Sequence, residues 1–199
     1  MVEGPARIGI FGGTFDPIHT GHVEAAETVY RKLGLDRMLL VVANEPWQKE
    51  GTRSVTPAED RYAMVEAATE GRPGLEPSRI EIDRGGPSYT VDTVNELHKL
   101  DPSSQLIVVV GADVVADLPT WRDEPTLRQN ATLAVVDRPG VTMVEPPSGW
   151  QSVRVQVPPF DVSSTELRAQ LEAGLPVEGL IPDPVIRCIR LRGLYATGR

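Results

Sequence analysis

The sequence has one cysteine, Cys188, among its 199 residues, which excludes an intrachain disulfide. None of its apolar runs approaches the length of a membrane-spanning helix. Residues 1–7 lack the basic region and the apolar stretch of a secretory signal. We therefore expect a cytoplasmic location and no membrane partner.

Positive charge is also scarce, since the formal net charge is -8 and lysine occurs only at positions 32, 49 and 99. A nucleic-acid-binding chain usually carries a basic cluster, so no nucleic-acid partner is expected. An anionic small ligand is still compatible with this balance, because a few cations and backbone N–H groups set the potential inside a cleft. Lys49 is the lysine that falls in an expected loop.

Apolar runs and helical patterns alternate along most of the chain. Strands are predicted at 7–11, 38–43, 79–83, 106–110, 132–137 and 153–157. Helices are predicted at 23–33, 56–70, 90–100, 163–174 and 182–192, with shorter ones ending near 118 and 129. This order predicts an α/β fold: a Rossmann-like, doubly wound, mainly parallel sheet with helices on both faces. We expect a single domain over 1–199, in which 161–199 forms a small C-terminal helical part.

Two helix starts carry capping signals. Thr56-Pro57-Ala58-Glu59 predicts a capping box with proline at the first helical position. Ser163 and Glu166 have the same spacing and predict a second capping box.

Residues 11–22 read Phe-Gly-Gly-Thr-Phe-Asp-Pro-Ile-His-Thr-Gly-His, between an expected strand and an expected helix. Gly12 and Gly13 would let a ligand approach the backbone, and a helix N-terminus suits phosphate. His19 and His22, two of only three histidines, are three residues apart and are predicted to share one helical face. The spacing matches neither a dinucleotide fingerprint nor a P-loop. A glycine turn alone is equally typical of a structural connection, but the histidine pair favours a polyphosphate site.

The stretch from Gly12 to His22 resembles the signature of the nucleotidyltransferase superfamily that carries His-x-Gly-His. Its second landmark, Ser-Ser-Thr-x-x-Arg, resembles Ser163-Ser164-Thr165-Glu166-Leu167-Arg168. That superfamily transfers a nucleoside monophosphate from a triphosphate. A cap at Ser163 and a phosphate site at the same helix start are compatible.

The middle of the chain resembles the bacterial nicotinate mononucleotide adenylyltransferases of that superfamily. The matching pieces are Pro87-Ser88-Tyr89-Thr90-x-Asp92-Thr93, Gly111-Ala112-Asp113, Leu118-Pro119-Thr120-Trp121 and Arg138-Pro139-Gly140. The resemblance covers nearly the whole chain. It implies ATP and nicotinate mononucleotide as substrates, Mg²⁺ carried by the ATP, and nicotinate adenine dinucleotide and pyrophosphate as products in NAD biosynthesis. A homo-oligomer is possible.

The resemblance also assigns residues to roles. Catalysis is expected from His22, His19 and Arg168. ATP binding is expected from Gly12, Gly13, Thr14, Phe15, His19, His22, Asp113, Ser163, Ser164, Thr165 and Arg168. Mononucleotide binding is expected from Lys49, Tyr89, Thr90, Trp121, Arg122 and Arg138. No protein ligand to a metal is expected.

The chemistry of a nicotinate ring agrees with part of this assignment. The ring is flat and carries a carboxylate, so Trp121 offers a stacking surface and the helix start at Tyr89 and Thr90 offers N–H donors with a favourable dipole. Each residue also has a plainer interpretation: Trp121 as core, Asp113 as a helix cap, Lys49 as a solvated side chain. Arg122 stands where an aromatic residue is frequent in the family.

Other functions stay open on the sequence alone. The same superfamily includes adenylyltransferases that act on nicotinamide mononucleotide or on phosphopantetheine. A non-catalytic nucleotide sensor on the same scaffold is an alternative of a different class.

Overall fold

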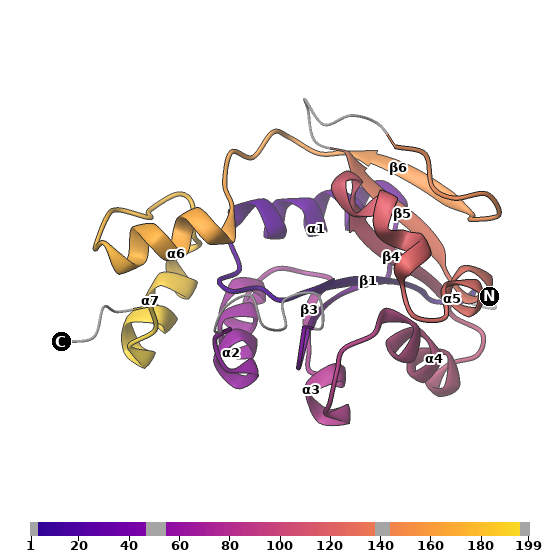
Figure 1. Cartoon of the computed structure of the whole chain (residues 1–199), viewed down its shortest axis with the longest axis horizontal. Helices are drawn as coiled ribbons and strands as arrows, with labels where there is room; N and C mark the ends of the chain where they lie inside the picture. Colours follow the sequence, from indigo (N-terminus) through magenta and orange to yellow (C-terminus); the bar gives the residue numbers. More distant parts are fainter. Residues whose placement is uncertain (1–3, 47–54, 138–143, 196–199) are drawn as a thin grey trace.

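The computed structural model describes residues 4–46, 55–137 and 144–195, and it is built around one twisted sheet (Figure 1). The sheet has six strands in the order β3-β2-β1-β4-β5-β6, and every neighbouring pair is parallel. The strands are β1 (Arg7–Gly13), β2 (Arg37–Val42), β3 (Leu75–Ser78), β4 (Gln105–Gly111), β5 (Thr132–Asp137) and β6 (Ser152–Gln156). β1 and β4 lie at the centre, where the direction of winding reverses. The predicted Rossmann-like, doubly wound fold is confirmed.

Continuous apolar runs form the inner strands because both of their faces are covered. The helical elements are α1 (Thr20–Leu33), α2 (Ala58–Thr69), α3 (Ile80–Arg84), α4 (Thr90–Leu100), the 3₁₀ segment η2 (Ala112–Thr120), α5 (Glu124–Asn130), α6 (Ser164–Glu172) and α7 (Asp183–Arg192). Val23 and Val29 of α1 belong to the core on one face of the sheet, and Val91 and Val94 of α4 to the core on the other. The two faces are therefore packed as separate cores.

Within the described residues of 161–195, the helices are α6 and α7, drawn in amber and yellow at one end of the molecule (Figure 1). Val185, Ile186 and Ile189 of α7 join the same core as Met64 of α2. Arg192 donates a hydrogen bond to Asp60 at 2.7 Å, which fixes the last turn of α7 against α2.

The strand predicted at 79–83 is wrong. The strand is β3, over Leu75–Ser78, and 80–84 forms the helix α3. Pro77 cannot donate to a sheet, but β3 is an edge strand that pairs only with β2, so proline is tolerated there. The alternation of Ile80 and Ile82 arises because these two side chains pack against the two different cores.

The capping box predicted at 56–59 is also wrong, because Pro57 is itself the N-cap of α2 and no side chain caps this helix. The predicted N-cap at Ser163 is confirmed, but the Glu166 carboxylate contacts the Ser163 hydroxyl and not the backbone N–H that a full capping box would use. The Ser163 hydroxyl accepts the N–H of Glu166 at 3.2 Å and donates to the Glu166 carboxylate at 2.7 Å.

Candidate active site

The turn after β1 is shaped by two glycines with different roles. Phe15 is buried, with a backbone φ of 50°, and its ring occupies the space beside Gly13. A Cβ on Gly13 would lie 2.8 Å from that ring, whereas a Cβ on Gly12 would meet nothing within 4 Å. Gly13 therefore makes room for Phe15, and Gly12 leaves the backbone open to a ligand. Phe15 supports the turn from the core.

The histidine pair stands at the start of α1. His19 is the N-cap, with extended backbone, and His22 is the third helical residue, so the two do not simply lie along one helical face as predicted. Their rings nevertheless stack, with centroids 3.7 Å apart. The His19 backbone N–H donates to Nδ1 of His22 at 3.4 Å. A neutral imidazole that accepts at Nδ1 carries its proton on Nε2, which makes Nε2 of His22 a hydrogen-bond donor.

A cavity of about 280 Å³ lies across the switch between β1 and β4. Nine of the predicted residues line it: Gly12, Gly13, Thr14, His22, Tyr89, Thr90, Asp113, Trp121 and Arg122. They come from the end of β1 and the residue after it, from the first turn of α1, from the start of α4, and from the two ends of η2. His19 is not among the lining residues and is only 3% exposed, beneath His22.

The Ser-Ser-Thr-x-x-Arg segment approaches the same turn from its other side. Ser164 donates its hydroxyl to the Pro17 carbonyl at 3.0 Å. Arg168 donates to the Asp16 carbonyl at 2.7 Å and to the Thr165 hydroxyl at 3.1 Å. The structure thus brings both sequence motifs together, although the residues of this segment lie outside the cavity lining.

Tyr195 adds a third contact from the C-terminal part. Its hydroxyl donates to the buried Asp16 carboxylate at 2.7 Å. Burial raises the pKa of Tyr195 well above its usual value, so the phenol stays protonated and keeps donating.

Arg61 is a residue of this region that the sequence analysis missed. Its side chain is 1% exposed and donates to the backbone carbonyls of Thr56, Thr14 and Asn44 at 2.7, 2.8 and 3.0 Å. It joins the turn after β1 to the chain on both sides of residues 47–54. A charged residue on a helix usually faces solvent, so the pattern offered no signal for this role.

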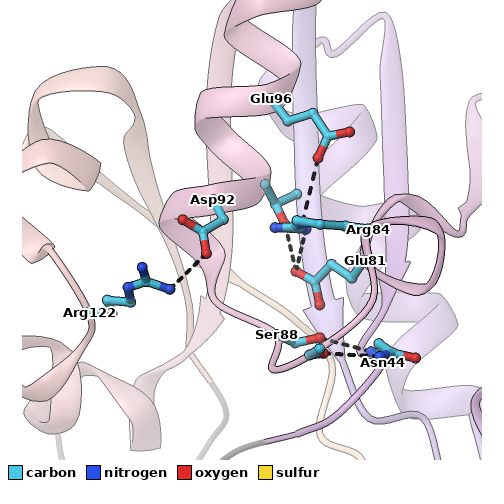
Figure 2. A network of polar contacts seen from close by, with 9 residues as sticks. Asn44, Glu81, Arg84, Ser88, Asp92, Glu96 and Arg122 are labelled. Atoms are coloured by element: carbon cyan, nitrogen blue, oxygen red, sulfur yellow. Dashed lines mark hydrogen bonds and ion pairs between the residues drawn. The ribbon is translucent and has the colours of Figure 1, made fainter.

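The opposite wall of the cavity is held by a polar network around the start of α4 (Figure 2). Glu81, buried and part of the cavity lining, accepts a hydrogen bond from Thr93 at 2.6 Å, and Arg84 donates to the same hydroxyl at 2.7 Å. The Asn44 backbone N–H donates to the Ser88 hydroxyl at 2.8 Å, directly before Tyr89. Glu81 was missed because its segment was predicted to be a strand.

Trp121 and Arg122 close the cavity at the end of η2. The Nε1 atom of Trp121 is buried and has no hydrogen-bond partner in the described parts of the chain, while its ring is part of the cavity lining. Asp113 lies at the start of η2 beside Gly111, where a Cβ would come within 2.3 Å of its carboxylate. Lys49 and Arg138 lie outside the described residues.

Two searches over the described residues bear on metals and membranes. Within 4–46, 55–137 and 144–195, no group of three or more His, Cys, Asp and Glu residues is placed to hold a metal ion. In the same ranges, no helix has the length and apolar character needed to cross a bilayer.

Comparison with known proteins identifies the family. The cytidylyltransferase-like family model matches residues 10–170. A Streptomyces coelicolor protein named probable nicotinate-nucleotide adenylyltransferase is 47% identical over 92% of this chain and 98% of its own length. A Thermus thermophilus protein of the same name is 44% identical over 95% of this chain and 99% of its own.

The fold agrees with a solved structure of Plasmodium falciparum nicotinic acid mononucleotide adenylyltransferase complexed with NaAD. The TM-score is 0.78 at 18% identity, over 96% of this chain and 97% of that one. The matching family model and the relatives' identity over almost the whole length show that the chain belongs to the cytidylyltransferase-like family, among the nicotinate-nucleotide adenylyltransferases.

Proposed function

We propose that this enzyme joins ATP and nicotinate mononucleotide to give nicotinate adenine dinucleotide and pyrophosphate, a step of NAD biosynthesis in the cytoplasm. One observation carries the proposal: a single cavity has His22 and Gly12 on one wall and Tyr89, Thr90 and Trp121 on the other. Two substrates can therefore meet across the strand switch, with phosphates at the start of α1 and the pyridine ring at the start of α4.

The proposed reaction is a direct in-line displacement. An oxygen of the mononucleotide 5′-phosphate attacks the α-phosphorus of ATP, and the bond from that phosphorus to the bridging oxygen breaks, releasing pyrophosphate. The attacking phosphate dianion is already a nucleophile, so neither a general base nor a covalent intermediate is needed. Catalysis then consists of positioning and of stabilising charge.

Each side chain has a part in this scheme. We assign to His22 a hydrogen bond from Nε2 to the α-phosphate as its oxygens gain charge, which follows from the Nδ1 contact with the His19 backbone. Gly12, Gly13, Thr14 and the first N–H groups of α1 would cradle the triphosphate. Arg168, with Ser163, Ser164 and Thr165 at the start of α6, would hold the β- and γ-phosphates together with His19, and Asp113 would contact the ATP ribose. Mg²⁺ would enter bound to ATP.

The test is the replacement of His22 by alanine, with the third histidine of the chain as a matched control. We expect His22→Ala to lower kcat by roughly 10²–10³-fold, the usual loss for a donor to a developing charge. His98→Ala, at the last turn of α4, should leave kcat within about twofold, because His98 does not line the cavity. Near-normal turnover of His22→Ala would remove its assigned role.

A substrate panel with pyrophosphate as the readout separates the alternative functions. The wild-type enzyme should release pyrophosphate from ATP with nicotinate mononucleotide, and much less with nicotinamide mononucleotide or phosphopantetheine. A sensor would release none with any acceptor.

A further inference from the structure

The ion pair between Arg122 and Asp92 spans two walls of the cavity. Arg122 follows Trp121 at the end of η2, and Asp92 lies in the first turn of α4. Nη1 of Arg122 lies 3.1 Å from Oδ2 of Asp92, and its guanidinium carbon lies 4.6 Å from the centre of the Tyr89 ring. Figure 2 shows Arg122 reaching across to Asp92.

The position of this pair matters because of which residues surround it. Tyr89, Thr90, Trp121 and Arg122 all line the cavity at the end that we assign to the pyridine ring. Contact with the Tyr89 ring face holds the guanidinium over that end, since a cation is attracted to an aromatic face. The Arg122 side chain is still 56% exposed, so it can turn towards a ligand.

The acid and amide mononucleotides have the same shape and differ by one negative charge. The amide also donates hydrogen bonds through its NH₂ group, whereas the carboxylate only accepts them. Discrimination therefore comes from the charges and the N–H donors around the pyridine substituent. Arg122 attracts the carboxylate of the acid form, while Asp92 repels it and already occupies part of the hydrogen-bonding capacity of Arg122. The two members of the ion pair act on this substrate choice in opposite directions.

We propose that Arg122 and Asp92 together set the preference of this enzyme for the acid over the amide mononucleotide. Arg122 supplies the attraction, and Asp92 limits it and keeps the guanidinium in place before substrate binds. This inference rests on the proposed function. It adds a side-chain contribution to the backbone N–H groups at the start of α4.

Single substitutions distinguish this role from a purely structural one, in which the ion pair only holds the end of η2 against α4. Arg122→Gln should lower the ratio of kcat/KM for the acid to kcat/KM for the amide by about 5–10-fold, through KM for the acid. Asp92→Asn should raise the same ratio by about 3-fold or more, because it removes repulsion and releases Arg122. A purely structural ion pair would give changes of the same sign in the acid-to-amide ratio, since either substitution breaks the pair.

Controls separate this effect from a general change in protein charge. The exposed pair of Arg37 and Glu76, 2.6 Å apart, lies on β2 and β3 away from the cavity lining. Arg37→Gln and Glu76→Gln change the charge in the same ways and should leave the acid-to-amide ratio unchanged. Raising the salt concentration should lower the ratio in the wild type more than in Arg122→Gln, because exposed charges are screened.

Two outcomes would overturn the proposal. The first is a change of the same sign in Arg122→Gln and Asp92→Asn. The second is an equal rise of KM for both mononucleotides in Arg122→Gln, which would place the guanidinium on a group that they share. Failure of the proposed function looks different, because the wild type would then release no pyrophosphate with the acid mononucleotide.

Discussion

Replacing Arg61 by methionine tests whether the turn after β1 is held from beneath by a buried cation. The change removes three hydrogen bonds to backbone carbonyls, of 2.7, 2.8 and 3.0 Å. A buried carbonyl that loses its partner costs about 1–3 kcal/mol, so the loss is roughly 3–9 kcal/mol before compensation. Relief of the desolvation of the guanidinium returns several kcal/mol. We expect a net loss of about 3 kcal/mol in the free energy of unfolding.

Urea titration followed by far-ultraviolet circular dichroism measures this loss. At this chain length, about 3 kcal/mol also corresponds to a fall of roughly 6–12 °C in the melting temperature. Arg190→Met is the matched control, because Arg190 is 71% exposed and 3.4 Å from Glu178; it should cost about 0.5 kcal/mol or less. Arg61→Lys, which keeps the charge, should fall between the two. A loss below about 1 kcal/mol for Arg61→Met would refute the reasoning.

Three further predictions concern the cavity and the thiol. Gly12→Ala should fold as the wild type but raise KM for ATP, since its methyl group would point into the open space left for the ligand. Gly13→Ala should lower the melting temperature, because its methyl group would lie 2.8 Å from the Phe15 ring. Equal melting temperatures of the two variants would contradict this. Trp121→Ala should raise KM for the mononucleotide by about 10-fold with a smaller change in kcat, and an unchanged KM would make the tryptophan purely structural. Burial raises the pKa of Cys188, so less of its thiolate is present at pH 8 in the folded chain. Iodoacetamide should therefore react with Cys188 roughly 3–10 times more slowly in the folded chain than in the urea-unfolded chain. Equal rates would contradict the pKa shift.

Much of the fold was predictable because buried parallel strands leave long apolar runs. The strand at 132–137 and the helix at 90–100 match the structure at both ends. β3 was missed because an edge strand can include Glu76 and Pro77, which weaken every strand signal. Over five residues, the alternation of Ile80 and Ile82 could not distinguish a strand from a short helix between two cores.

The sequence motifs led to His22 and Trp121, which line the cavity, and to the two segments that meet at the turn after β1, while the functional roles of these residues stay predictions. Arg61 could not be foreseen because its partners are backbone carbonyls, which every residue possesses. The ion pair of Arg122 with Asp92 joins residues 30 positions apart, and only the folded chain shows that they meet.

The contacts made by the C-terminal helices to the β1 turn have a consequence for synthesis. The partners of Pro17 and Asp16 are 147, 152 and 179 residues away, at Ser164, Arg168 and Tyr195. A ribosome adding about 5–20 residues per second takes roughly 7–36 s between making the turn and making these partners. The six strands of the described sheet all precede Ser164, so a nascent chain can form its sheet while the turn after β1 still lacks these three contacts. With ATP bound at that turn as proposed, we expect tight ATP binding only after translation has passed α7, the last helix described.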